Sequence, residues 1–231
     1  MEIPRFLAMT GAEFAFSDPK PERLAWMACH FSSYGTGLSN LPGELPPGSL
    51  LILNDRIPVC GHDPEKICRE LEEAVSALAC CGILLDLQRP KDPQTAAIVK
   101  AITALPFPVA VTPEYAQGLP CPVFLPPPSL HVPLHKHLDP WKGREIWLEA
   151  ALDACTITVT PAGAKAEPIP YIQAGTLFED ETLHCHYTTE IGEDAVHFKL
   201  YRTESDLKAL LAEAEALGVA CSIGLYQELG K

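Results

Sequence analysis

The stretch GILLDLQRP, residues 82–90, carries the fold prediction because it begins as an uninterrupted apolar run and ends in polar residues and a proline. Continuous apolar runs of this length are typical of parallel strands that are buried on both faces. Proline has no N–H for the strand ladder, so Pro90 marks where pairing has ended. The stretch therefore predicts a buried parallel strand with a polar carboxyl end.

This pattern recurs along the chain. Apolar runs that stop at a proline lie near residues 50, 82, 108, 122 and 156, and further strands are expected near residues 5, 25 and 220. Eight parallel strands are the number that closes a barrel. The predicted fold class is therefore α/β, a compact and irregular (β/α)₈ TIM-type barrel, with an open doubly wound sheet as the alternative.

Helix signals lie between several of these strands. Asp63 and Asp92 are each followed by a proline, which is typical of an N-cap followed by the first helical position. Residues 203–206, TESD, resemble a capping box, and Gly218 is placed to end the helix that this box begins. Alternating strands and helices favour a parallel sheet with helical crossovers.

Two segments depart from a regular barrel. Between Thr112 and Pro122 there is no room for a helical crossover, which usually needs a dozen or more residues. Either a short irregular turn replaces the helix, or one of the two flanking strands is wrongly predicted. Residues 184–189 and 195–201 predict an added β-hairpin before the last helix. No linker is recognisable, so we predict one domain over residues 1–231.

Composition narrows the class of function. The 231 residues carry a net charge of −13, which disfavours nucleic acids and anionic membranes as partners. No signal peptide and no apolar run of the ~18 residues that span a membrane are found. The nine cysteines form no CxxC pair and lie mostly in apolar segments, so reduced thiols and a cytoplasmic location are expected. Neither the cysteine nor the histidine spacing indicates a metal site, and no cofactor motif is present.

Candidate site residues follow from the barrel prediction, because barrel sites lie at the carboxyl ends of the strands. The polar side chains expected there fall into four groups, one after each of four predicted strands. They are Asn54 and Asp55; Asp86 and Gln88; Glu114 and Tyr115; and Tyr226, Gln227 and Glu228.

The stretch that begins at Gly82 resembles the fourth strand of glycoside hydrolase family 18, the chitinase-like barrels, whose pattern is Gly-x-Asp-x-Asp-x-Glu. Gly82 and Asp86 match this pattern, Leu84 stands in place of the first Asp, and Gln88 stands in place of the catalytic Glu. The resemblance covers residues 50–90 and 150–231, and the sixth-strand Tyr-Asp of the family is absent.

Residues 184–231 are similar to the spore-associated, peptidoglycan-directed branch of that family. In that branch an aromatic-rich hairpin precedes a helix, and a final strand ends near Trp-x-Leu-Gly. Tyr226 stands in place of the tryptophan, although alignment on the closing Leu229-Gly230 puts Gln227 there instead.

The resemblance implies a specific loss of chemistry. In the family the Glu protonates the glycosidic oxygen while the acetamide of the substrate acts as nucleophile. Gln88 cannot donate that proton. The implied function is a degenerate, non-hydrolytic barrel, a pseudoenzyme that binds an oligosaccharide or another polar small ligand. One alternative is an active hydrolase that uses Asp86 with Glu114 or Glu228. The other is a structural or interaction protein, and the sequence leaves the oligomeric state open.

Overall fold

The structure is a computed structural model that describes residues 3–33, 35, 37–170 and 178–230. The chain forms two compact units. The barrel unit comprises residues 4–125, 143–149 and 220–231, and the antiparallel unit comprises the described residues of 1–3, 126–142 and 150–219. The expectation of one domain over residues 1–231 stays a prediction.

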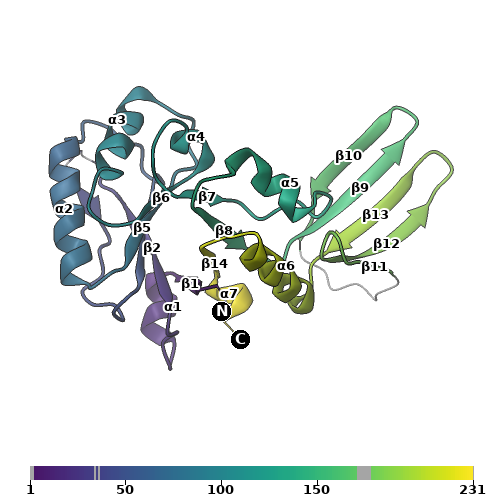
Figure 1. Cartoon of the computed structure of the whole chain (residues 1–231), viewed down its shortest axis with the longest axis horizontal. Helices are drawn as coiled ribbons and strands as arrows, with labels where there is room; N and C mark the ends of the chain where they lie inside the picture. The colour runs from purple at the N-terminus through teal and green to yellow at the C-terminus, as the bar shows by residue number, and fades with distance from the viewer. Residues whose placement is uncertain (1–2, 34, 36, 171–177, 231) are drawn as a thin grey trace. The chain divides into compact units, whose positions relative to one another are not determined.

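The barrel unit contains a closed sheet (Figure 1). Its parallel strands among the described residues are β1 (Arg5–Met9), β2 (Leu24–Phe31), β4 (Leu50–Asn54), β5 (Gly82–Asp86), β6 (Val109–Val111), β7 (Val123–Leu125), β8 (Ile146–Ala150) and β14 (Cys221–Leu225). The sheet closes because β1 pairs with both β2 and β14. A short strand, β3 (Leu38–Ser39), runs antiparallel to β2. The predicted (β/α)₈ class is confirmed.

The barrel helices begin where the sequence predicts. Asp63 caps α2 (Pro64–Ala77) and Asp92 caps α3 (Pro93–Ile102), each by accepting hydrogen bonds from backbone N–H groups of the first turn. Helix α4 (Pro113–Ala116) has only four residues, so a short turn does replace the crossover between β6 and β7. The remaining helices are α1 (Gly11–Phe16) and α7 (Tyr226–Leu229). Within the described part of the chain, no helix combines the length and apolar character needed to cross a membrane.

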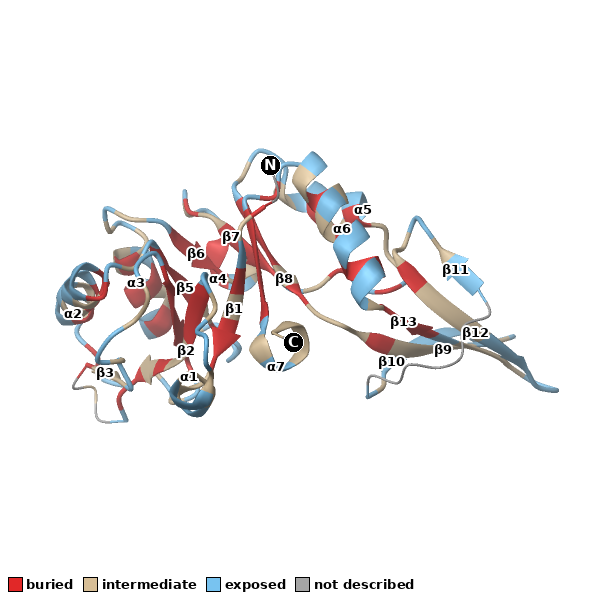
Figure 2. Ribbon diagram, turned by 90° about the horizontal axis from the view of Figure 1, so that it is seen from below, coloured by how far each residue is buried: buried red, intermediate tan, exposed pale blue. Residues whose placement is uncertain are grey.

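Side chains from alternate strand positions fill the inside of the barrel. Ile52, Leu84 and Phe124 belong to one buried cluster with Trp147 and other inward-facing residues. Because neighbouring residues of a strand point to opposite faces, Leu85 is fully buried without joining that cluster. The strands are therefore covered on both faces, as the continuous apolar runs predict (Figure 2).

The antiparallel unit is built on a second sheet, with the order β10-β9-β13-β12-β11. Its strands are β9 (Ala154–Thr160), β10 (Gly163–Pro168), β11 (Phe178–Asp180), β12 (Cys185–Ile191) and β13 (Val196–Tyr201). The helices of this unit are α5 (Leu134–Leu138), η1 (Asp139–Trp141) and α6 (Glu204–Ala216). Strands β12 and β13 form the predicted hairpin, and Thr203 with Asp206 forms the predicted capping box of α6.

One strand assignment from the sequence is wrong. Residues 156–160 were expected in the barrel, but they lie in β9, which pairs antiparallel with β10 and β13. The barrel strand at that point of the chain is β8, which has no proline at its end. The physical reason is visible in the sequence TITVT, since alternating polar and apolar residues are typical of a strand buried on one face only.

All nine cysteines lie in the described part of the chain, and none of them forms a disulfide. Cys29, Cys185 and Cys221 are buried, and burial raises the pKa of each thiol to about 12. These thiols are therefore protonated at neutral pH and pack as small apolar groups.

Candidate functional site

A cavity of ≈650 Å³ lies at the carboxyl ends of the barrel strands, where barrel proteins carry their sites. Its apolar lining includes Ile52, Leu84, Phe124 and Ile223. Its polar lining consists of Thr10, His30, Asn40, Asn54, Asp55, Arg56, Asp86, Gln88, Arg89 and Glu149. Four of the residues expected from the sequence, Asn54, Asp55, Asp86 and Gln88, are thus brought together at one end of the barrel.

Asp86 and Gln88 are neighbours at this cavity. Asp86 ends β5 on the same face as Leu84, and the Gln88 side-chain amide nitrogen lies 3.3 Å from each oxygen of the Asp86 carboxylate. Burial raises the pKa of Asp86, and the charge of Asp55 acts in the same direction, while the hydrogen bond from Gln88 opposes both. Asp86 therefore holds its proton more tightly than a carboxyl in water.

Asn54 uses its side chain to join two strands. Its amide nitrogen donates to the backbone oxygens of Met27, at 3.1 Å, and Cys29, at 2.9 Å. The pairing of β2 with β4 shifts register between Trp26 and Cys29, so these bonds hold an irregular part of β2. A ligand-binding role for Asn54 stays a prediction, because the structure shows the amide engaged with backbone.

Asp55 holds the loop that follows β5. Its carboxylate is buried and accepts hydrogen bonds from the backbone N–H of Gln88, at 3.0 Å, and of Arg89, at 2.8 Å. The Arg89 guanidinium donates in return to the backbone oxygens of Asp55 and Arg56. Asp55 therefore positions Gln88 over Asp86, and its expected contact with ligand stays a prediction.

The other candidates do not line this cavity. Glu114 and Tyr115 lie in α4, where Glu114 is exposed and Tyr115 is buried under the Lys91 side chain. Tyr226, Gln227 and Glu228 lie in α7 and are absent from the lining that the described residues provide. The short helix α4 begins two residues after the end of β6, and α7 begins at the residue after β14. An acid–base role for Glu114 or Glu228 beside Asp86 stays a prediction.

Glu149 is the carboxylate of the cavity lining that the sequence did not predict. It lies on β8, the barrel strand that was not predicted, two residues after the inward-facing Trp147. Residues i and i+2 of a strand face the same side, so Glu149 faces the barrel interior like Asp86. The signal was a single carboxylate near the end of the otherwise apolar run IWLEA.

Comparison with solved structures finds proteins with a similar fold. No family model and no curated protein matches the sequence. Among solved structures, the Bacillus cereus spore cortex-lytic enzyme SleL shares 10% identity at a TM-score of 0.57, over 97% of this chain and 71% of that one. The putative sporulation-specific glycosylase ydhD from Bacillus subtilis shares 8% identity at a TM-score of 0.55, over 86% and 88% of the two chains.

A third structure, the C-terminal domain of a putative chitinase from Desulfitobacterium hafniense, shares 10% identity at a TM-score of 0.54 and covers 98% of this chain and 94% of its own. At such identities the likeness is one of fold. The resemblance to chitinase-like and spore-associated barrels that the sequence indicates is confirmed at that level.

Proposed function

We propose that this protein is a glycoside hydrolase-like barrel that binds carbohydrate at the mouth of the barrel and does not hydrolyse it. The observation that carries the proposal is the contact between Gln88 and Asp86 at the cavity. By the family pattern, Gln88 stands where the proton donor would be. An amide has no acidic proton to transfer to a glycosidic oxygen, so the step that breaks the bond lacks its acid.

The same groups suit binding. A carboxylate accepts hydrogen bonds and an amide both donates and accepts them, which matches the hydroxyl and acetamide groups of a sugar. The apolar side chains below them, such as Leu84 and Phe124, offer contact for the C–H face of a sugar ring. The cavity volume falls within the ~300–1,000 Å³ range of small-molecule sites.

The catalytic half of the proposal is tested with N-acetylglucosamine oligomers and their aryl glycosides. We expect no measurable turnover by the natural protein. Because general acid catalysis contributes roughly 10²–10⁴-fold, Gln88→Glu should show a trace of turnover that the double variant Asp86→Ala/Gln88→Glu loses. Robust turnover by the natural protein, unchanged by substitution of Gln88 or Asp86, would refute the proposal.

The binding half is tested by titration calorimetry with the same oligomers. Asp86→Ala is expected to weaken binding by roughly tenfold or more, as for the loss of a buried hydrogen bond to a charged group. Glu114→Gln is the matched control, because Glu114 is exposed and does not line the cavity. Equal weakening in both variants, or no binding by the natural protein, would count against a carbohydrate site.

An active hydrolase is the second candidate, and Glu149 is the observation that favours it. Asp86 and Glu149 line one cavity from β5 and β8, so the cavity holds two inward-facing carboxylates. Such pairs carry out acid–base hydrolysis in many glycosidases. In that case Asp86→Asn and Glu149→Gln would each abolish turnover of the true substrate, and Gln88→Ala would not.

We also propose that the protein resides in the cytoplasm with its cysteines reduced. The support is that none of the nine cysteines is paired in the structure. Thiol titration of denatured, unreduced protein should then find nearly nine free thiols per chain. Three or four disulfides would overturn this assignment.

A further inference from the structure

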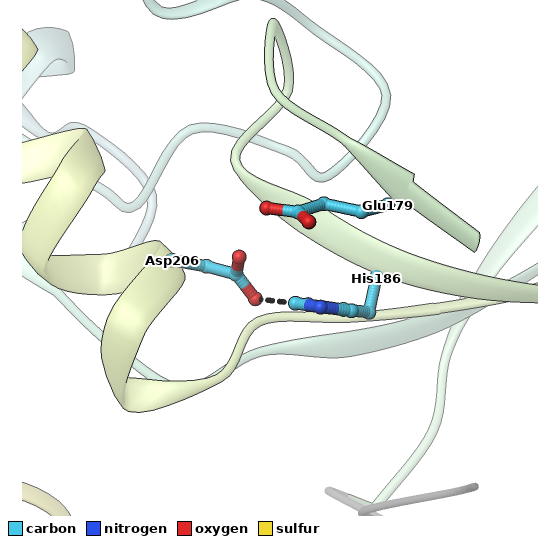
Figure 3. Close-up of side chains that lie close together, drawn as sticks. All are labelled: Glu179, His186 and Asp206. Carbon is cyan, nitrogen blue, oxygen red and sulfur yellow. Dashed lines mark hydrogen bonds and ion pairs between the residues drawn. The ribbon is translucent and has the colours of Figure 1, made fainter. Parts of the chain in front are cut away.

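Three potential metal ligands meet in the antiparallel unit, and none of them lines the cavity of the barrel unit. Glu179 of β11 and His186 of β12 are direct partners across the two strands, and Asp206 lies in the first turn of α6 (Figure 3). One ligand atom from each residue lies within 4.8 Å of those of the other two. A helix and two strands thus place one imidazole and two carboxylates around one point.

Asp206 is the fixed member of this trio. It is only 4% exposed, and its Oδ2 accepts hydrogen bonds from the backbone N–H and hydroxyl of Thr203 and from His186 Nδ1, at 2.7–2.8 Å. Burial acts to raise the pKa of Asp206, but these hydrogen bonds outweigh it and hold the pKa below its ordinary value. The carboxylate is therefore charged at neutral pH.

The second carboxylate oxygen of Asp206, Oδ1, lies outside this hydrogen-bond network. All the hydrogen bonds to this carboxylate among the described residues go to Oδ2, and Figure 3 shows the other oxygen turned toward the carboxylate of Glu179. Two carboxylates that face one another repel, and a cation between them reverses the sign of that interaction. The imidazole of His186, held by Asp206 and stacked on Tyr201, lies beside both.

We infer that Glu179, His186 and Asp206 bind one divalent transition-metal ion, with water completing its coordination. Imidazole and carboxylate ligands suit manganese and zinc. Bonds of ~2.0–2.2 Å place neighbouring ligand atoms roughly 3 Å apart, so the trio must contract. The exposed side chain of Glu179 can make that movement. The His186 nitrogen that binds the ion must be unprotonated, so coordination through Nδ1 would release the proton that Asp206 accepts.

Manganese is the probe of choice, because the nine thiols of this chain would also take zinc. The metal-stripped full chain is titrated with Mn²⁺ in ~0.15 M salt, and free Mn²⁺ is followed by electron paramagnetic resonance. We expect one site per chain. Glu179→Gln and Asp206→Asn should each weaken it by roughly tenfold or more, as the loss of metal-site partners does.

The control variants separate this site from general attraction to an acidic protein. Glu190 lies on β12 with His186, on the same face of the strand, and its partner on β13 is His197. Glu190→Gln removes this carboxylate and should leave the Mn²⁺ affinity unchanged. Asp206→Asn keeps an oxygen that can accept the hydrogen bonds from Thr203, and circular dichroism checks that α6 remains folded. Glu179 is exposed, so its variant tests the site without risk to the fold.

Unchanged affinity in Glu179→Gln would overturn the inference, and so would the absence of any site in the natural protein. Loss of the site in Asp86→Asn would overturn it as well, because the cation would then lie in the barrel cavity. Retention in Asp86→Asn and Glu190→Gln, with loss in Glu179→Gln, would support it.

Discussion

The two sheets of this protein differ in how many of their faces are covered. Strands β4 and β5 of the barrel unit are buried along four of their five residues. Every residue of β10, in the antiparallel unit, is exposed. Figure 2 shows the same contrast in colour, with red barrel strands and pale blue strand tips in the antiparallel sheet. The sequences differ accordingly: β4 and β5 read LLILN and GILLD, whereas β10 reads GAKAEP.

This difference decides where polar chemistry is found. A strand that is covered on both faces has room for polar side chains only at its end, as with Asp86 at the end of β5. A strand that is covered on one face carries polar groups along its whole length, and β12 alternates His186, Thr188 and Glu190 on the face opposite Cys185 and Tyr187. One unit therefore concentrates its candidate site, and the other spreads polar residues over a surface.

The largest expected effect on stability comes from placing a charge at a buried barrel position, compared with an exposed position of the antiparallel sheet. Leu85→Asp should prevent soluble folding, because an unpaired charge in the layer outside the barrel strands costs several kcal/mol. Ile191→Asp, at a position that is 82% exposed in the antiparallel sheet, should change stability by less than about 0.5 kcal/mol. Soluble yield and thermal melting measure both. A melting temperature near that of the natural protein in Leu85→Asp would contradict the burial of β5 on both faces.

A smaller effect is expected in the core of the antiparallel unit. Leu200→Ala removes a buried side chain that packs with Cys185 and Leu130, and should cost about 2–4 kcal/mol. Calorimetry of this variant also tests the one-domain prediction. A single shifted transition agrees with one cooperative domain, whereas a shift in only one of two transitions would show that the two units melt separately.

Two carboxylates should respond to pH with opposite signs. The pKa of Asp206 is lowered by its hydrogen bonds, so its contribution to stability is present above the ordinary pKa and is lost as pH falls through the lowered one. The pKa of Asp86 is raised by burial, so its contribution is present at low pH and is lost as pH rises through the raised value.

At pH 7, Asp206→Asn should therefore cost about 1–2 kcal/mol, and Asp86→Asn should add roughly 0.5–2 kcal/mol. Urea unfolding of both variants at pH 7 and near pH 3 checks the signs, and both differences should shrink at the lower pH. The same sign for the two variants would contradict the assignment of these environments.

The smallest effect should be the same in both units. Asp63→Ala and Thr203→Ala each remove an N-cap side chain, from α2 and α6, and each should cost about 1 kcal/mol. Caps act within one helical turn, so this loss does not depend on how the neighbouring sheet is covered. Urea midpoints that differ by much more between the two variants would show that one cap has a further structural role.

Much of this architecture is local, and the sequence alone determined it. The prolines after Asp63 and Asp92 marked two helix starts, and residues 203–206 marked a third. The apolar run from Gly82 marked a doubly covered strand and placed Asp86 and Gln88 at its end, where the cavity lies. These features succeed because neighbouring residues produce caps, strand ends and side-chain alternation without help from distant parts of the chain.

What only the tertiary structure decided depends on distant pairing. The barrel takes β8 as one of its strands in place of residues 156–160, and this choice depends on which strands meet in space. Glu149 lines the cavity because it lies on β8. Asp55 holds the loop after β5 because the backbone N–H of Gln88 lies beside its carboxylate in space. Glu179, His186 and Asp206 come from three segments whose spacing in the sequence does not indicate a metal site, so the sequence predicted none. The proposed site rests on their closeness in space. Spacing reports contacts within one element, while contacts between elements appear only when burial of apolar surface has chosen the packing.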